Sequence, residues 1–406
     1  MVRKKIIIIA STFLFILFSS CLAFSYWQKN LPLVSPLDLV ENLSPINNIL
    51  KKKSEKVIFG FMPYWNLRQA NQLRVKELTH LAYFGIDLNP DGTVKQFLNK
   101  RETEPGFNKL NSHELSLLMR QIKILNKKNI LVIRAMDNDL IESIVNSKNH
   151  SKISIDNIIR ILTQFHFDGL NIDFEYIGSP NQITKDNFSS YVSDLSSACK
   201  ISLPNCEMSI DILADTGVKN RIHNLSAISK SLDHIIIMAY DYYRSSSTIA
   251  GPVAPLRGKC DNKTTSPCLE YDVVSSVSDI SRQVPTKKLI LGIPFYGYEW
   301  QVASPNFLAN TYPKSGGIAT YKRIQSLISD PPNPENFANT WSEVTKSPYI
   351  VYEERGQLFQ IHYENTLSLK LKLDLVNQSI LGGIGIWALG YETPNTDLWD
   401  TIDRFL

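Results

Sequence analysis

The sequence predicts an α/β protein whose main domain is a closed (β/α)8 TIM barrel with a small α+β insertion between strand 7 and strand 8. Three observations support this fold class. Eight short apolar runs, rich in β-branched or aromatic residues, recur from Val57 onward. Amphipathic stretches with helical spacing lie between them. The first run is not followed by the glycine-rich phosphate turn that usually marks a doubly wound sheet, which is the main alternative.

The eight runs are too brief for helices and are predicted to be the barrel strands. They are Val57–Trp65, His80–Asp87, Ile130–Asp137, Phe167–Tyr176, Glu207–Leu213, His234–Tyr242, Lys288–Tyr298 and Gly382–Leu389. Strands that alternate with helices in this number favour a closed parallel barrel over an open sheet.

Two of the intervening segments show how the helices are predicted. Asn111 and Glu114 form a capping-box pattern ahead of four apolar residues that share one helix face. The segment 368–376 alternates Leu with Lys or Asp, so its periodicity alone would allow a strand. We predict a helix there because Leu367, Leu371 and Leu375 form an i, i+4 row and because a parallel strand must be reached by a crossover.

The barrel domain is predicted to span residues 57–406, with residues 301–363 as the insertion. The remaining length is close to the about 250 residues that such a barrel needs. Within the insertion, the segments 349–353 and 358–363 have the pattern of a hairpin joined around Gly356. We expect this small subdomain to lie beside the mouth of the barrel.

Length and composition are those of an ordinary globular protein. The chain has 406 residues, of which 43% are hydrophobic and 20% charged, which excludes a disordered chain, a collagen and a coiled coil. The formal charge is +4, and three of the positive charges come from Arg3, Lys4 and Lys5. The rest of the chain is close to neutral, so its charge gives no reason to propose a nucleic acid or an acidic surface as partner.

The N-terminus, residues 1–25, is predicted to be a signal peptide or a membrane anchor. The three basic residues are followed by an apolar run at 6–24, which is typical of an export signal. Residues 26–56 contain several prolines and no sustained period, and they are predicted to be a linker. We therefore expect a secreted or extracytoplasmic protein.

How the N-terminus is processed stays open between three alternatives. Ala23 and Ser25 form a small-x-small site that favours cleavage before Tyr26. A lipoprotein-like site at Cys21 is weaker, because Phe18 is bulky where such sites usually have Leu. An uncleaved anchor that tethers the protein to a membrane is the third alternative, since the apolar run is just long enough to span a bilayer core.

The other four cysteines form two close pairs, Cys199 with Cys206 and Cys260 with Cys268. An even number suits an oxidising compartment, and two short disulfides are predicted. A zinc site is the competing interpretation, but neither pair has the C-x-x-C spacing that a structural zinc site usually shows. We expect neither a metal nor an organic cofactor. Four unpaired thiols would follow if the protein were not exported.

The fourth predicted strand contains a row of polar residues. Alternate side chains of a strand share a face, so Gly169, Asn171, Asp173 and Glu175 are predicted to point into the barrel. A fold seldom buries carboxylates in a row for packing alone. Glu175 comes last, at the carboxyl end of the strand, where barrel enzymes have their active sites. A nearby carboxylate and partial burial would raise the pKa of Glu175, as a general acid requires. The alternative is a solvated acidic strand end without a catalytic role.

Four motifs, in order along the chain, carry a resemblance to a known family. The segment 168–175 resembles the D-G-x-D-x-D-x-E signature of glycoside hydrolase family 18, the chitinases and their relatives, with Asn171 in place of the middle Asp. Residues 238–241, which are Met-Ala-Tyr-Asp, 292–297 and 383–387 resemble the family's motifs on the sixth, seventh and eighth strands. The similarity covers residues from about 57 to 400.

The resemblance implies a substrate-assisted hydrolysis that retains configuration, which is an exception to the scheme with two catalytic carboxylates. It implies that Glu175 protonates the glycosidic oxygen and that the acetamido oxygen of the substrate attacks the anomeric carbon. Asp173 would bind the acetamido N–H, and Tyr240 would position its carbonyl. The implied substrate-binding residues are Asn171, Met238, Asp241, Trp387, Tyr64 and Tyr298. Asp168 has the opposite parity and is predicted to be structural.

The sequence departs from the family pattern at two places. The third strand has Arg134-Ala135-Met136-Asp137 where S-x-G-G is common, and Asn171 is neutral. Because the common Ser helps to balance the middle Asp, the two departures are consistent with each other. They are similar to the spore-cortex-lytic and di-N-acetylchitobiase branches, which implies peptidoglycan or short N-acetylglucosamine oligomers as substrate. We predict that neutral Asn171 leaves Asp173 ionised at lower pH than a carboxylate neighbour would.

Two other classes of function remain as alternatives. A lectin on the same barrel is one, since the fold alone does not assign activity, although such lectins typically lack the Glu. A structural or interaction protein is the other. The aromatic residues at the strand ends, Tyr64, Trp65, Tyr298 and Trp300, are expected to divide between sugar contacts and the core. We expect a monomer.

Overall fold

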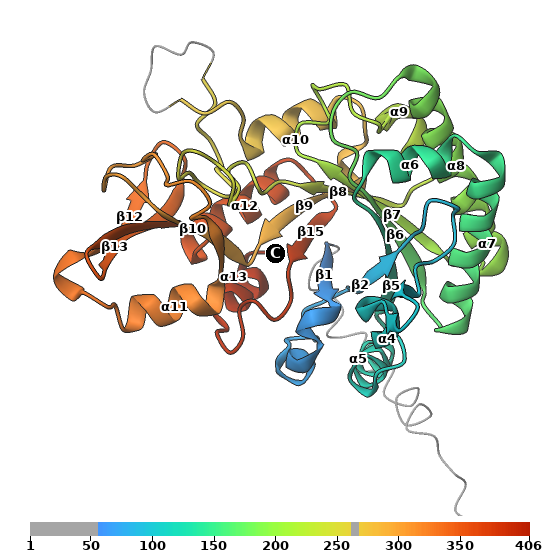
Figure 1. The fold of residues 1–406 in the computed structure, drawn as a ribbon, viewed down its shortest axis with the longest axis horizontal. Helices are drawn as coiled ribbons and strands as arrows, with labels where there is room; N and C mark the ends of the chain where they lie inside the picture. Colours follow the sequence, from blue (N-terminus) through green and yellow to red (C-terminus); the bar gives the residue numbers. More distant parts are fainter. Residues whose placement is uncertain (1–55, 261–267) are drawn as a thin grey trace, which may run out of the picture. The chain divides into compact units, whose positions relative to one another are not determined.

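Eight parallel strands close into a barrel in the computed structural model, which describes residues 56–260 and 268–406 (Figure 1). The strands follow one another around the barrel in the order β1-β15-β9-β8-β7-β6-β5-β2. Their bounds are β1 Val57–Pro63, β2 His80–Asp87, β5 Lys128–Ala135, β6 Gly169–Phe174, β7 Glu207–Leu213, β8 His234–Met238, β9 Leu289–Pro294 and β15 Gly383–Trp387. All described residues belong to one compact unit of the chain, 54–406.

All eight predicted strands are confirmed, and two of them have the predicted bounds. The largest difference is at strand 7, which was predicted to run to Tyr298 but ends at Pro294. Proline has no N–H to donate to the next step of the ladder, so the strand stops there. The following strand, β10 (Tyr296–Gln301), pairs with a different sheet.

Helices follow most of the barrel strands and cover the outside of the barrel (Figure 1). Their bounds are α4 Pro105–Lys109, α5 His113–Ile124, α6 Asn138–Val145, α7 Lys148–Gln164, α8 Gln182–Ser202, α9 Leu225–Ile228, α10 Val273–Ser281, α12 Thr366–Gln378 and α13 Asp397–Phe405. Short 3-10 turns occupy η1 Tyr64–Gln72 and η2 Thr286–Lys288, and a two-stranded ribbon is formed by β3 Phe97–Asn99 and β4 Glu102–Thr103.

The two helices that were predicted from local pattern are present, each with a correction. The N-cap of α5 is Ser112, one residue after the predicted Asn111, and its hydroxyl accepts from the N–H of Leu115. In α12 the leucine row of the prediction is not the buried face, since Leu367 is 48% exposed. Burial instead follows a neighbouring stripe that includes Lys372, whose ammonium pairs with buried Glu364 at 2.7 Å.

A five-stranded antiparallel sheet lies between β9 and α12 in the chain. Its strands, in spatial order, are β11 Gly317–Thr320, β10, β14 Gln357–His362, β13 Ser347–Glu354 and β12 Phe337–Ser342, with α11 Tyr321–Ser329 and η3 Pro334–Asn336 between them. The expected hairpin around Gly356 is formed by β13 and β14. The sheet begins at Tyr296, before the boundary at 301 that the sequence suggested, because β10 leaves the barrel directly.

Two apolar layers surround the strands. The inner one fills the barrel with Phe59, Phe61, Phe84 and their neighbours, while the outer one packs Leu170 and Ile172 of β6 against the helices. The predicted parity of β6 is therefore confirmed, because its apolar residues belong to the outer layer and Asn171 meets side chains of β7 inside the barrel.

Both predicted disulfides are present, between Cys199 and Cys206, with Cα atoms 5.8 Å apart, and between Cys260 and Cys268, at 5.6 Å. The predicted signal or anchor, the Cys21 alternative and nearly all of the linker lie outside the described residues. Within the described ranges, no helix is long and apolar enough to cross a membrane.

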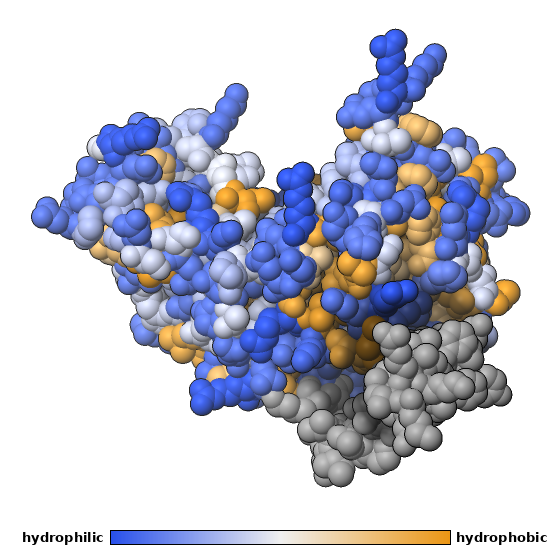
Figure 2. Space-filling view, turned by 90° about the horizontal axis from the view of Figure 1, so that it is seen from below, coloured by the Kyte–Doolittle hydropathy of each residue, from blue (hydrophilic) through white to orange (hydrophobic). Residues whose placement is uncertain are grey.

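The surface seen in Figure 2 is hollowed between the side that carries β12, β13 and α11 and the side that carries α6 to α8. Hydrophobic side chains form separate patches among hydrophilic ones on this face. The walls of the hollow are therefore mostly polar in this view.

Candidate active site

The carboxyl end of β6 places Glu175 at the mouth of the barrel. Its backbone N–H donates to the carbonyl of Ala135 at 2.9 Å, which fixes it beside the end of β5. The side chain is half-buried and lines a cavity of about 750 Å³ that opens at this end. Burial, the largest cause, raises the pKa of Glu175, Asp241 adds to the effect, and the charge of Arg244 opposes it. The predicted direction is confirmed, although the neighbouring charge comes from Asp241.

Asn171 lies deeper in the barrel and is completely buried. Its amide donates to Ser209 Oγ at 3.1 Å and to Asp211 Oδ1 at 3.0 Å, both on β7. Its own Oδ1 has no hydrogen-bond partner. Asn171 thus joins β6 to β7, and the substrate contact expected for it stays a prediction.

Asp173 is the central buried carboxylate, with only 2% of its surface exposed. Burial first, and then the charges of Asp211 and Glu175, raise its pKa well above the usual range, while Arg134 opposes them. Its Oδ1 has no hydrogen-bond partner. A buried acceptor without a donor is rare in native proteins and suggests a missing ligand group.

Arg134 supplies the positive charge next to Asp173. The two residues are register partners on β5 and β6, and Arg134 is in turn the partner of Asp87 on β2. Its guanidinium pairs with Asp87 at 2.5 Å and lies 4.5 Å from the centre of the Phe84 ring. The side chain at the position where the sequence departs from the family pattern therefore balances the buried acids.

Sequence reasoning missed Asp211. It lies on β7, is 4% exposed, and burial raises its pKa to about 8, with the hydrogen bond from Asn171 opposing. The carboxylate beside Asn171 is therefore that of Asp211, which belongs to the neighbouring strand β7. The signal was available, because Ser209 and Asp211 alternate with apolar residues and must share a face. The predicted effect of Asn171 on Asp173 stays a prediction.

Tyr240 follows β8 and lies among the acids. Burial raises the pKa of Tyr240 well above its usual value, and the charges of Asp211, Asp173, Asp241 and Glu175 add to the effect in that order. The phenol therefore keeps its proton and can donate a hydrogen bond.

Asp241, the next residue, has a left-handed backbone with φ of 61°. Its Oδ1 accepts hydrogen bonds from the hydroxyls of Tyr296 and Tyr298, the latter at 3.1 Å. Burial raises the pKa of Asp241, whereas the bond from Tyr296 lowers it. Tyr298 is only 6% exposed and its hydroxyl holds Asp241, whereas the sugar contact expected for it stays a prediction.

Trp387 ends β15 and forms an aromatic cluster at the mouth. Its ring centre lies 4.5 Å from that of Phe84 and 6.4 Å from that of Trp65. Trp65 is 45% exposed and stands edge-on to Tyr64 at 4.9 Å, whereas Trp300 is fully buried. Of the four predicted strand-end aromatics, Tyr64 and Trp65 thus remain accessible, and Tyr298 and Trp300 belong to the core.

The cavity extends from Glu175 across the loops that follow β7 and β8. Met238, Tyr240 and Asp241 line it as well. Asp168, by contrast, accepts from the N–H of Asn129 at 2.8 Å, which agrees with the structural role predicted for it.

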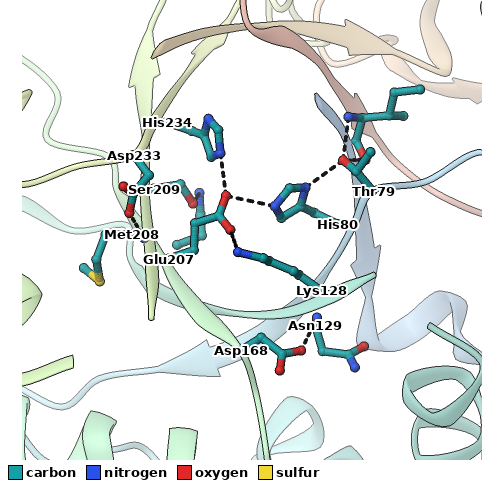
Figure 3. A network of polar contacts seen from close by, with 12 residues as sticks. Thr79, His80, Lys128, Asn129, Asp168, Glu207, Met208, Ser209, Asp233 and His234 are labelled. Carbon is teal, nitrogen blue, oxygen red and sulfur yellow. Dashed lines mark hydrogen bonds and ion pairs between the residues drawn. The ribbon is translucent and has the colours of Figure 1, made fainter. Parts of the chain in front are cut away.

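A second polar cluster, the basal network, lies near the amino ends of the strands (Figure 3). Glu207 Oε1 meets Nε2 of His234 at 2.5 Å and Nε2 of His80 at 3.0 Å, and Lys128 contacts its other oxygen. Among the described residues this is the one group of His and carboxylate ligands compact enough to hold a metal ion. The protein already satisfies its carboxylate, so we treat the basal network as structural.

Comparison with protein families and curated proteins gives a consistent match. The model described as "Glycosyl hydrolases family 18" matches residues 57–392. The putative sporulation-specific glycosylase YdhD of Bacillus subtilis is 23% identical over 62% of this chain and 54% of its own. Human di-N-acetylchitobiase is 25% identical over 55% of this chain and 57% of its own length. Chitinase B of Serratia marcescens is 22% identical over 89% of this chain and 81% of its own length. The chain thus spans little more than half the length of the Bacillus and human relatives.

Solved structures share the fold. The GH18 chitinase of Cycas revoluta, in complex with (GlcNAc)3, superimposes with a TM-score of 0.72 and 20% identity over 86% of this chain and 99% of that one. The class V chitinase of Nicotiana tobaccum superimposes with a TM-score of 0.72 and 21% identity over 86% of this chain and 98% of that one. The barrel and its closure are therefore common to these proteins.

Proposed function

The chain belongs to glycosyl hydrolase family 18, and on that premise we propose that it is an exported enzyme that cleaves β-1,4 linkages of N-acetylglucosamine-containing glycans. Chitin oligomers and peptidoglycan are the candidate substrates. The observation that supports this best is the arrangement on β6: a half-buried Glu175 at the mouth and, two residues behind it, a buried Asp173 with an unpartnered oxygen.

Glu175 is the proposed general acid. Burial raises its pKa, which favours the protonated form that protonation of a glycosidic oxygen requires. The carboxyl group also faces the cavity, where a leaving sugar can lie.

The proposed nucleophile is the acetamido oxygen of the substrate. A classical retaining enzyme would need a second free carboxylate at the cavity. The other lining acids are held by partners or exposed to solvent: Asp215 is held by Arg221 at 2.7 Å, Asp241 by two tyrosines, and the side chain of Glu270 is 88% exposed. Attack would form an oxazolinium ion and release the protonated leaving sugar, and water would then open the ion with retained configuration.

The remaining predicted residues are proposed to hold the reacting sugar. The unpartnered Oδ1 of Asp173 would accept the acetamido N–H, and Tyr240 would donate to its carbonyl. Trp387 would form the apolar floor, and Asp241 would support the sugar from a position fixed by Tyr296 and Tyr298. These groups are placed before substrate arrives, which lowers the cost of orienting it.

Export is proposed from the apolar N-terminus of the sequence and from the two disulfides, since such bonds persist in oxidising compartments. Fractionation of producing cells would test it. Protein found only in the cytoplasm, with free thiols, would contradict it.

Hydrolysis of a fluorogenic di-N-acetylchitobioside and of its N-deacetylated analogue tests the mechanism. We expect release from the acetylated substrate alone, with the β-anomer as first product by NMR. Equal rates for both substrates, or an α-anomer, would contradict substrate assistance. Tight binding of chitin oligomers without turnover of any glycan would assign the barrel to a lectin instead.

A further inference from the structure

We propose that the cavity beside Glu175 recognises a leaving-group sugar that carries a carboxylate. The inference rests on the proposed function and selects among its substrates: it favours a glycan in which N-acetylglucosamine alternates with an acidic sugar over neutral chitin.

The cavity is positioned to receive the leaving sugar. Glu175, the proton donor, stands at one side, and the loops after β7 and β8 form the rest of the wall. Tyr242, Tyr243 and Tyr271 belong to this wall as well. The sugar that accepts the proton of Glu175 would thus lie in this cavity, next to the reacting sugar that Tyr240 and Asp241 would hold.

Four basic side chains line the same cavity, and they differ in their partners. Arg221 holds Asp215 through two nitrogens, at 2.9 and 2.7 Å, and Lys219 contacts the same carboxylate at 3.0 Å. Arg244 and Lys259 have no ion pair with any residue in the described ranges. Arg244 is exposed and makes one long bond, from Nε to the carbonyl of Asp241 at 3.4 Å.

Lys259 lies on the same wall, and its ammonium is 5.1 Å from the centre of the Tyr271 ring. Among the described acids that line the cavity, Asp215 is held by Arg221 and Lys219, Asp241 accepts from two tyrosines, and Glu270 lies 3.6 Å from Lys219. Arg244 and Lys259 are therefore the two cations of this wall with which no described carboxylate pairs. Charged groups that are held near a sugar site without a partner strongly favour a ligand of opposite charge.

Arg244 is close enough to Glu175 for its charge to lower the pKa of that acid. A carboxylate bound to Arg244 would neutralise this charge and help Glu175 to keep its proton. A neutral leaving sugar leaves the cation uncompensated. An acidic leaving sugar would thus favour both binding and proton transfer.

Two sources share this chemistry, a 3-O-lactyl group as in N-acetylmuramic acid and a uronic acid. Matched substrates separate them. Peptide-free glycan strands of N-acetylglucosamine and N-acetylmuramic acid are compared with the same strands after reduction of the lactyl carboxylates to alcohols. Hyaluronan hexasaccharide provides the uronic acid, and N-acetylchitotetraose the neutral control.

We expect the lactyl glycan to be cleaved with a kcat/KM about tenfold above that of its reduced form, and this ratio to fall with added salt. The double variant Arg244→Gln/Lys259→Gln should bring the ratio close to one. Lys152→Gln, a surface cation paired with Asp156 outside the cavity, is the matched control and should keep the ratio. A preference for hyaluronan would assign the site to uronic acids.

Equal rates for the lactyl and reduced glycans would overturn the inference while leaving the proposed function intact. So would a double variant that slows both equally. Binding to Glu175→Gln protein, measured by calorimetry, tests recognition without turnover. If the native protein cleaves no glycan, a preference for the lactyl form in this binding assay still supports the inference, and equal affinities overturn it.

Discussion

The two ends of the barrel each contain buried acidic side chains, and they treat them in opposite ways. At the amino end, Glu207 is surrounded by His234, His80 and Lys128, and despite its burial these donors hold its pKa well below the usual range. At the carboxyl end, Asp173 and Asp211 have raised pKa values and few donors. The comparison shows that buried carboxylates serve two purposes in one barrel. At the amino end their hydrogen bonds stabilise the fold, and at the carboxyl end carboxylate oxygens remain free to accept hydrogen bonds from a ligand.

Removal of Glu175 should give the largest functional effect. We expect Glu175→Gln to lower kcat on a fluorogenic chitobioside by about 10³-fold and to leave the melting temperature nearly unchanged, since no hydrogen bond of its side chain to a described residue is lost. Glu343→Gln, an exposed acid paired with Lys346, is the control for both measurements. A variant with substantial residual activity would remove Glu175 from the role of acid.

Asp173 tests whether the carboxyl end is built for function at a cost in stability. Asp173→Asn should reduce kcat by about 10²-fold while the free energy of unfolding stays equal or increases, because repulsion with Asp211 and Glu175 is relieved. Urea unfolding at pH 7 measures the second quantity. A clear loss of stability would show that Asp173 is a structural residue like Glu207.

Glu207 should behave in the opposite way. Glu207→Gln removes the negative charge that the two histidines and Lys128 share and replaces one of its two acceptor oxygens by an NH2 donor, so we expect a loss of about 2–3 kcal/mol in unfolding free energy with kcat retained. The folded-state pKa of Glu207 is lowered, so its stabilisation is present above its ordinary pKa of 4.5 and is lost as the pH falls further. The difference between native and variant protein in urea should therefore shrink below that pH. A constant difference would contradict this account.

Asp211 sharpens the comparison through the direction of its pH dependence. A carboxyl group with a pKa of about 8 in the fold and 3.8 in its ordinary state makes the folded protein less stable as the pH rises between these values. Asp211→Asn should therefore be stabilised relative to native protein by at least about 1 kcal/mol at pH 8 and by much less at pH 4. Equal differences at both pH values would show that Asp211 is not held protonated.

The barrel could be predicted from the sequence because each strand is recognisable from the apolar and polar residues of its own segment. Periodicity within β6 placed Asp173 and Glu175 on one face, and the structure agrees. The pairing of Asn171 with Asp211, and of Arg134 with Asp173, depends on the register between neighbouring strands, which no single segment encodes.

Which of the polar aromatic side chains are buried could not be predicted from the sequence either. Tyr298 has the composition and position of a sugar contact, yet β10 leaves the barrel at Tyr296 and turns its hydroxyl toward Asp241. In α12, both leucine stripes had helical spacing, and only the packing of the neighbouring elements decides which one is buried.

The left-handed backbone of Asp241 limits what can replace it during evolution. Aspartate, asparagine and glycine accept such a conformation far more readily than other residues do. Single-base changes in an aspartate codon reach both asparagine and glycine, so the lineage can discard this negative charge without disturbing the turn. A larger side chain, such as that of glutamate, would be strained in this backbone conformation. Loss of the negative charge is therefore an easier mutational path than its transfer to a longer side chain.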